Sequence, residues 1–154
     1  MKPRIYLDTS AIGGYYDEEF ALWSRQLIYE IRQGLKIAII SDLTLLELEG
    51  APQNVKDILP SIPPENLENV VLGQEAENLA QNYILSRVVT ETHIADAQHI
   101  AVATVERVDV LVSWNFKQIL NLNRIHLFNS VNLKLGYPIL EIRSPREVIN
   151  EKKI

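Results

Sequence analysis

The sequence predicts an α/β fold, a three-layer α/β/α arrangement around a mainly parallel central sheet of four or five strands. Two observations carry this prediction. Short apolar runs without clear in-out alternation indicate strands that are buried on both faces. Amphipathic helical segments separate most of these runs, as the crossovers between parallel strands require. Because 154 residues is the length of one ordinary domain, residues 1–154 are expected to form a single domain.

Helix boundaries in the first half of the chain are indicated by capping residues at their starts and by glycine or proline at their ends. Glycines 13 and 14 are interpreted as loosening the turn after the first strand. The expected elements are a strand at 4–7, a helix from an Asp17 cap to Gly34, a strand at 36–40, a helix from a Ser41 or Asp42 cap to Leu48, and one helical turn at 55–59.

The second half continues the alternation. Its clearest helix spans 76–84, where apolar residues recur at i, i+3, i+4, i+7 and i+8. The other expected elements are an edge strand at 69–72, a helix from a Thr90 or Thr92 cap through Thr104, a strand at 109–113, helices at 116–122 and 124–135, a strand at 139–142, and a short helix opened by a Ser144–Glu147 capping box.

Composition indicates a globular protein, with 47% hydrophobic and 23% charged residues. The chain has no cysteine, which excludes disulfides, thiolate metal sites and cysteine nucleophiles. No apolar run approaches the roughly 18 residues of a membrane span, and Asp8 interrupts the apolar run near the N-terminus. We therefore expect a soluble, cytoplasmic protein without a membrane segment.

Charge is distributed unevenly along the chain. The net charge of −5 argues against an extended, non-specific grip on nucleic acid. Residues 1–78 carry six Lys/Arg against thirteen Asp/Glu, whereas residues 114–154 carry seven against three. The C-terminal cations are either a phosphate-binding group or scattered solvated charges, and the sequence leaves both readings open.

Polar side chains are expected to meet at one edge of the sheet, because strand ends and helix starts share an edge in a parallel α/β fold. Asp8 follows the first predicted strand, and Asn115 follows the strand at 109–113. Asp96 lies in the first turns of the helix that leads into that strand. Glu47 lies further along its own helix, but its long side chain tilts back toward the helix start. These four side chains should face one cleft.

Three acids in one cleft need a cation. Burial and mutual repulsion raise the pKa values of clustered carboxyl groups, and no Lys or Arg adjoins Asp8, Glu47 or Asp96 in the sequence. A divalent metal would supply the missing charge, and oxygen-only ligation favours Mg²⁺ or Mn²⁺ over zinc. Taken singly, each acid could equally be a helix cap or a surface charge.

Histidines and aromatic residues near these acids are better explained by packing. His93 and His99 lie about 120° apart around a helix that turns roughly 100° per residue, so packed histidines are favoured over a zinc site. Trp114 and Phe116 are expected to pack beneath the site, with base stacking as the alternative. No P-loop, dinucleotide fingerprint or serine-hydrolase elbow occurs.

Four motifs follow one another along nearly the whole chain: Asp8-Thr9-Ser10 after a strand, Ser41-x-x-Thr44-x-x-Glu47-Leu48 at a helix start, Asp96-x-x-x-Ile100-Ala101-x-Ala103 in a helix, and Val112-Ser113-Trp114-Asn115-Phe116 at a strand end. In order and spacing they resemble a PIN domain. The compact size is similar to that of the VapC-type toxins of prokaryotic toxin–antitoxin pairs. The resemblance implies a metal-dependent endoribonuclease, usually homodimeric, which a small antitoxin inhibits.

The resemblance also implies roles for individual residues. Asp8, Glu47 and Asp96 correspond to the first three family acids, which would bind Mg²⁺ or Mn²⁺ and act in catalysis. Asn115 stands where many members have a further Asp; its carbonyl can orient water but adds no negative charge. The site therefore offers one negative charge fewer to a second metal. Thr9 and Ser10 are expected to contribute hydroxyl groups.

The leading hypothesis is hydrolysis of RNA phosphodiester bonds, in which Glu47 either completes the metal site or holds the attacking water. A second hypothesis is a catalytically weak or inactive PIN-like module that binds RNA or a protein, which the Asn115 substitution favours. A third is phosphoryl transfer through an aspartyl-phosphate at Asp8. The sequence disfavours the third, because Ser10 stands where a haloacid-dehalogenase-type phosphatase has a second Asp.

Overall fold

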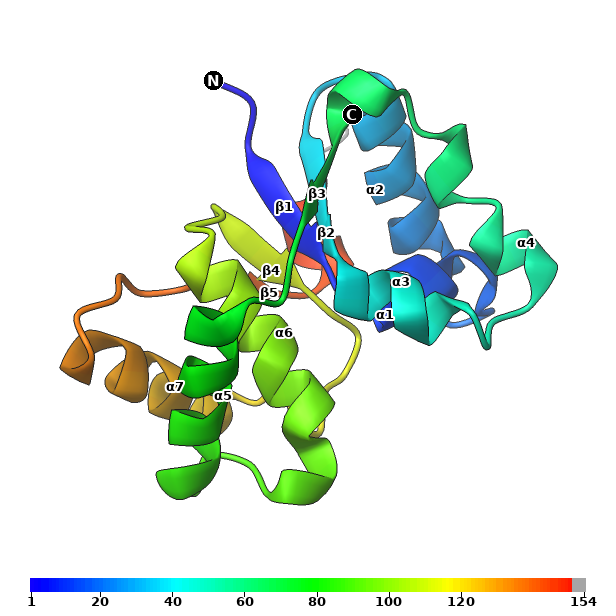
Figure 1. Cartoon of the computed structure of the whole chain (residues 1–154). Coiled ribbons are helices and arrows are strands. Elements are labelled where there is room, and N and C mark those ends of the chain that lie inside the picture. The colour runs from blue at the N-terminus through cyan, green and yellow to red at the C-terminus, as the bar shows by residue number, and fades with distance from the viewer. Residues whose placement is uncertain (151–154) are drawn as a thin grey trace.

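The central layer is a five-stranded sheet in which every neighbouring pair of strands is parallel. The computed structural model describes residues 1–150. The strand order is β3-β2-β1-β4-β5 (Figure 1), which confirms the predicted parallel sheet. The last strand is shorter than the predicted strand at 139–142. The strands are β1 (Arg4–Leu7), β2 (Ile37–Ser41), β3 (Leu67–Val70), β4 (Val110–Val112) and β5 (Ile142–Arg143).

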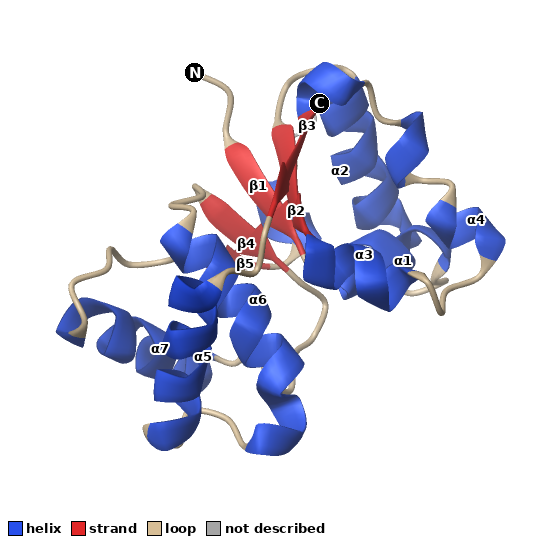
Figure 2. Cartoon of the chain, viewed as in Figure 1, coloured by secondary structure: helices blue, strands red, loops and turns tan. Residues whose placement is uncertain are grey.

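Helices cover both faces of the sheet. In Figure 2, α2 lies on one side, and α5, α6 and α7 lie on the other. The three-layer α/β/α prediction is therefore confirmed. The helices are α1 (Thr9–Gly13), α2 (Ala21–Arg32), α3 (Asp42–Leu48), α4 (Gln53–Lys56), α5 (Gln74–Leu85), α6 (Ile94–Val105), α7 (Leu122–Lys134) and α8 (Pro145–Val148).

Successive strand residues point into two separate hydrophobic cores. Tyr6, Ile39 and Leu111 belong to the core that includes buried residues of α5, α6 and α7. Ile5 and Leu7 belong to the core on the α2 face. Burial of both faces explains why the strands read as continuous apolar runs without alternation.

The sheet changes its direction of winding between β1 and β4. From β1 the chain adds β2 and β3 on one side, and it later adds β4 and β5 on the other. At such a switch point the connections after the two central strands run to opposite sides, which leaves a crevice outside their carboxyl ends. Here those connections begin at Asp8 and Ser113.

The segment after β1 differs from its prediction. Asp8 caps the short helix α1, and a 3₁₀ turn, Gly14–Tyr16, follows directly. The prediction that Asp17 caps the next helix is wrong, because its side chain accepts a hydrogen bond from the Glu19 amide and α2 begins only at Ala21. The extra turns keep the chain close to the carboxyl edge of the sheet before α2 starts.

Gly14 has a packing role that the sequence interpretation missed. A Cβ atom at this position would lie 2.5 Å from Ser24 Oγ and 2.6 Å from Trp114 Nε1. A Cβ at the neighbouring Gly13 would meet no atom within 4 Å. Only Gly14 is therefore required for the close approach of α2 and the segment after β4.

The segment after β4 also differs, because the helix predicted at 116–122 is wrong. The backbone oxygen of Asn115 accepts hydrogen bonds from the amides of Ile119 and Leu120, which closes turns rather than a helix. Asn121 then caps α7 through its side chain. The apolar spacing that suggested a helix arises because Ile119 is buried in the core beneath the turn.

Helix caps are otherwise mostly as predicted. Ser41 caps α3 through its side chain, and Ser144 and Glu147 form the capping box that opens α8. Neither Thr90 nor Thr92 caps α6, because a 3₁₀ turn, Glu91–His93, precedes the helix and its last residue, His93, occupies the N-cap position. That turn places the start of α6 against the sheet edge.

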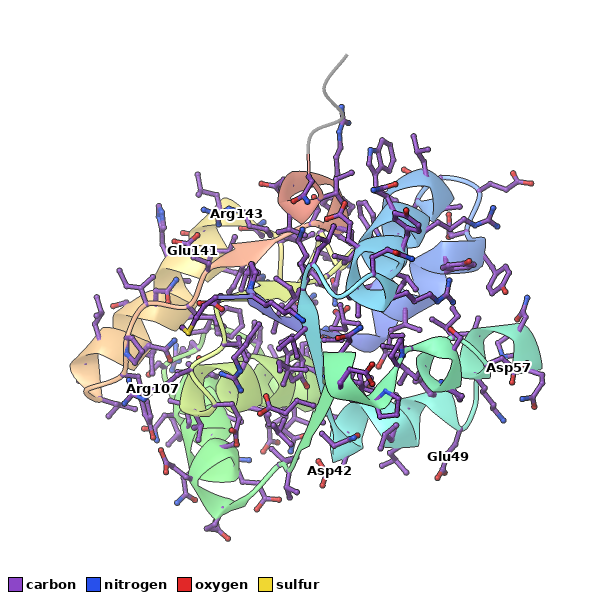
Figure 3. The ribbon with its side chains drawn as sticks, turned by 90° about the horizontal axis from the view of Figure 1, so that it is seen from above. Asp42, Glu49, Asp57, Arg107, Glu141 and Arg143 are labelled. Atoms are coloured by element: carbon purple, nitrogen blue, oxygen red, sulfur yellow. The ribbon has the colours of Figure 1, made fainter. Side chains whose placement is uncertain are left out.

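Charged side chains lie apart on the surface of the molecule. The acidic Asp42, Glu49 and Asp57 lie on the α3–α4 side, whereas Glu141 and Arg143 lie together on the opposite side (Figure 3). Arg143 and Glu141 form an ion pair at 2.6 Å. Within residues 1–150, no helix has the length and apolar character needed to cross a membrane.

Candidate active site

A pocket of about 340 Å³ opens at the carboxyl edge of the sheet. Four of its residues are those predicted from the sequence, and they come from four separate segments of the chain. Two hydroxyl residues and one histidine join them. The lining residues are Asp8, Thr9, Ser10, Glu47, Asp96, His99 and Asn115.

Asp8 is held rigidly at the base of the pocket. Its Oδ1 atom accepts hydrogen bonds from the Ser10 hydroxyl at 2.8 Å and the Ala11 amide at 2.9 Å, and its Oδ2 atom accepts one from the Ser113 hydroxyl at 2.5 Å. Burial raises the pKa of Asp8, although the charge of His99 and these hydrogen bonds oppose the rise. The carboxylate therefore occupies a fixed position that favours a nearby cation.

The Glu47 carboxylate is hydrogen-bonded to two neighbouring side chains of the pocket. Its Oε1 atom accepts hydrogen bonds from the Thr9 hydroxyl at 2.8 Å and from His99 Nε2 at 2.5 Å. Burial alone would raise the pKa of Glu47, but the hydrogen bond and charge of His99, together with the Thr9 hydroxyl, outweigh it and lower the pKa. Glu47 is thus the acid that stays ionised most readily.

His99 is a site residue that the sequence reasoning missed. The expected packing is present, since the residue is only 2% exposed, yet its ring also lines the pocket. Nδ1 lies 2.6 Å from the Tyr6 hydroxyl, which in turn lies 2.8 Å from Ser41 Oγ. A carboxylate can only accept hydrogen bonds, so Nε2 carries a hydrogen toward Glu47. The available signal was the position of His99 one helical turn after Asp96.

Asp96 lies in the first turn of α6, as predicted, and its side chain remains 22% exposed. Burial is the main cause of its raised pKa, and the charges of Asp8 and Glu47 add to the rise, while His93 and His99 oppose it. His93 Nδ1 lies 3.5 Å from Asp96 Oδ2. Asp96 is therefore a second carboxylate whose ionised form would gain from a cation.

Asn115 is oriented by its own turn. Its Oδ1 atom accepts a hydrogen bond from the Gln118 amide at 2.9 Å, and its Nδ2 atom donates one to Asp96 Oδ1 at 3.3 Å. The amide therefore presents a hydrogen-bond donor to Asp96. An aspartate at this position would present a second negative charge instead.

Comparison with known proteins finds similarity in structure rather than in sequence. No protein-family model matches the chain, and no curated protein matches it. The VapC20 toxin of Mycobacterium tuberculosis, described as cleaving the sarcin–ricin loop, superposes with a TM-score of 0.53 at 14% identity over 89% of this chain and 98% of the toxin. VapBC2 of Rickettsia felis, solved with a promoter DNA fragment, superposes with a TM-score of 0.58 at 14% identity over 92% of this chain and 98% of the solved chain.

The chain has the PIN-domain fold. The similarity extends over nearly the full length of both solved chains, so the fold as a whole is shared. The resemblance inferred from the four sequence motifs is confirmed at this level. In the PIN-domain fold the pocket of this chain occupies the switch point of the sheet, where α/β folds bind their ligands.

The donor atoms of this PIN-domain pocket suit a hard cation. Asp8 and Asp96 supply carboxylate oxygens, and Mg²⁺ is commonly held by one or two carboxylates with water and substrate phosphate in its other positions. Within residues 1–150, no group of three acidic or histidine side chains is arranged to hold a metal ion. Glu47 is hydrogen-bonded to Thr9 and His99. A two-carboxylate site fits the residues present.

The aromatic residues beside Asn115 have different surroundings. Trp114 is buried, stacks on Phe20 with ring centroids 4.2 Å apart, and donates from Nε1 to Ser24 Oγ at 2.8 Å, as expected for a packing residue. Phe116 is 54% exposed, so its predicted core position is wrong. The turn after Asn115 directs its ring to the surface beside the pocket.

The C-terminal cations do not form one patch in the part of the chain that the structure describes. Arg143 pairs with Glu141 and also lies 3.8 Å from Glu147. The guanidinium carbon of Arg146 lies 5.0 Å from the Trp23 ring centroid. Two further lysines of the predicted group lie outside the described residues. Arg143 and Arg146 are therefore engaged in separate contacts.

Proposed function

We propose that this protein is a metal-dependent endoribonuclease that hydrolyses RNA phosphodiester bonds and acts as the toxin of a toxin–antitoxin pair. The observation that carries the proposal is the convergence of Asp8 and Asp96, two carboxyl groups with raised pKa values, in one pocket at the switch point of a PIN-domain fold. The description of VapC20 as a toxin that cleaves the sarcin–ricin loop supports the reaction class.

In this proposal Asp8 and Asp96 hold Mg²⁺ or Mn²⁺. When bound, the metal lowers the pKa of water and offsets negative charge on the phosphate. Asp8 contributes a fixed geometry through its three hydrogen bonds. Asn115 holds Asp96 in place through its Nδ2 donor.

Glu47 would take the proton of the attacking water. As an ionised carboxylate it can accept a proton; its lowered pKa keeps it ionised to lower pH and makes it a weaker base than an ordinary glutamate. His99 and Thr9 fix its carboxylate, and the Tyr6 hydroxyl fixes the His99 ring from behind. Glu47 therefore serves as the base, while His99 and Tyr6 are positioning residues.

A cleavage assay on a mixture of single-stranded and structured RNAs tests the proposal. Wild-type protein should cut RNA with Mn²⁺ or Mg²⁺ and should not cut it with EDTA. Asp8→Asn and Asp96→Asn should each abolish cleavage while the proteins remain folded by circular dichroism. Cleavage that persists through both chelation and substitution would contradict the metal-nuclease proposal.

The biological setting follows the same similarity. On the similarity to VapC20 and VapBC2, we extend to this chain a cytoplasmic location, a homodimeric state and a small antitoxin partner. Co-expression with the product of an adjoining short reading frame should yield a stable complex that no longer cuts RNA. Light scattering after size-exclusion chromatography measures the oligomeric state directly.

A binding module without catalysis is the second candidate, and Asn115 favours it. The Asn115 amide presents a donor to Asp96 where a further acid would add charge for a second metal. This candidate expects RNA binding without cleavage under any divalent metal. It also expects that Asn115→Asp creates metal-dependent cleavage, whereas the nuclease proposal expects cleavage before the substitution.

A further inference from the structure

A second pocket adjoins the candidate active site on the side of the α5–α6 connection. Its volume is about 390 Å³, within the range of roughly 300–1,000 Å³ that is usual for ligand sites. Its apolar floor consists of Ile84, Val88 and Val89, and its polar wall consists of Arg87, Thr90, His93, Gln118 and Arg124. Among residues 1–150, no acidic side chain lines this pocket.

The two pockets meet through direct contacts. His93, which lines the second pocket, reaches Asp96 of the first at 3.5 Å. Gln118, which also lines the second pocket, donates its backbone amide to Asn115 Oδ1 at 2.9 Å. One layer of side chains therefore separates the second pocket from the carboxylates.

The two arginines of the second pocket differ in how they are held. Arg124 is fixed, because Nε donates to the Lys117 carbonyl at 3.2 Å and Nη1 donates to the Val88 carbonyl. Arg87 is exposed at the end of α5. Within residues 1–150, neither guanidinium forms an ion pair with an acidic side chain. In a chain with a net charge of −5, two arginines without acidic partners beside an acidic pocket are complementary to an anion.

We propose that this pocket binds a nucleotide of the RNA strand next to the scissile phosphate, with the phosphate at Arg87 and Arg124 and the base against the apolar floor. A guanidinium offers paired donors that match phosphate oxygens. The arrangement rests on the proposed nuclease function, because it places the RNA beside the Asp8–Asp96 pocket. The pocket would give this acidic protein a local cationic site that binds RNA.

Arg87, which lies just after α5, can be substituted without straining the backbone. Arg87 has φ of 61°, in the left-handed region that glycine adopts without strain. Arg87→Gly removes the guanidinium while leaving the backbone turn at least as favourable. Arg107 has φ of 53° at the end of α6, where the chain enters β4 at the opposite edge of the sheet. Arg107→Gly is therefore a matched control for charge, residue type and backbone conformation.

Fluorescence anisotropy with a short labelled single-stranded RNA of mixed sequence, in EDTA so that nothing is cut, measures binding apart from cleavage. Arg87→Gly should weaken binding by about tenfold, the loss expected for one charged hydrogen-bond contact. It should also reduce the slope of log K against log salt by about 0.7, the value for one phosphate contact on a single strand. Arg107→Gly should bind as the wild type does.

The outcomes separate this inference from the proposed function. Equal binding by the two glycine variants overturns the pocket assignment, even if wild-type protein cuts RNA with Mn²⁺. Selective weakening in Arg87→Gly supports the assignment, even if no metal induces cleavage. If wild-type protein binds no RNA and Arg87→Gly instead loses affinity for a co-expressed acidic protein, the pocket is a protein-binding site and the RNA assignment is wrong.

Discussion

The Nε2 atom of His99 lies 2.5 Å from Oε1 of Glu47, and this contact sets the ionisation of the acid. Without His99, burial would raise the pKa of Glu47; with it, the pKa is lowered. Because the folded-state pKa lies below the ordinary value, the contact contributes stability above that ordinary value and loses it as the pH falls through the folded-state pKa.

His99→Phe should therefore move the acid limb of the cleavage pH profile to higher pH, because Glu47 would then protonate more readily. His99→Gln can still donate a hydrogen bond and should shift the limb less. The measurement is kcat/KM as a function of pH with Mn²⁺. An acid limb at the same pH in all three proteins would show that Glu47 is not the base.

Metal loading should stabilise the wild-type protein. A ligand at 100 times its Kd adds about 2.7 kcal/mol to the free energy of unfolding, so Mn²⁺ should raise Tm in a concentration-dependent way. In EDTA, Asp96→Asn should be more stable than the wild type near neutral pH, because the raised pKa of Asp96 marks an ionised group that the fold disfavours.

The EDTA difference between Asp96→Asn and the wild type should close as the pH falls and Asp96 takes up a proton. The variant should also lose most of its response to Mn²⁺. Differential scanning fluorimetry with and without Mn²⁺ measures both effects. A wild-type Tm that does not change when Mn²⁺ is added would contradict the two-carboxylate site.

Gly14→Ala should destabilise the fold by about 1–3 kcal/mol, the usual range for overpacking, because the new Cβ would collide with Ser24 and Trp114. Gly13→Ala is the control. It meets open space in a helical conformation, with φ of −60°, and should be neutral or slightly stabilising. Urea unfolding measures both, and equal stabilities would contradict the close packing.

Phe116→Ala should weaken RNA binding by about 1–3 kcal/mol if a base stacks on the ring, with little effect on Tm because Phe116 is 54% exposed. Tyr29→Ala is a matched control, since Tyr29 has the same exposure and lies on α2. Anisotropy with labelled RNA in EDTA compares the two. Unchanged binding in Phe116→Ala would leave the ring without a role in RNA recognition.

Sequence reasoning identified the residues whose positions depend only on strand order. Asp8, Asp96 and Asn115 follow strands or begin a helix at one edge, so a parallel sheet brings them together whatever the packing details. His99 could not be assigned in this way. Whether its ring reaches the pocket or stays in the core depends on how α6 is rotated against β1, where Tyr6 contacts it.

The errors of local structure have a common cause in the turns at the same edge. The apolar residues after Asn115 have helical spacing, but backbone hydrogen bonds to Asn115 close turns there and expose Phe116. The residues after Asp8 form α1 because the Asp8 carboxylate caps it. In both places a site residue organises the backbone, which spacing alone does not reveal.

The hydrogen bond between Asp8 and Ser113 joins residues that lie 105 positions apart in the sequence. During synthesis the strand that carries Asp8 emerges early, but the group that fixes its carboxylate follows only after about two thirds of the chain. The complete pocket therefore requires β4 to lie beside β1. A ribosome-bound nascent chain that stops short of β4 cannot yet make this contact.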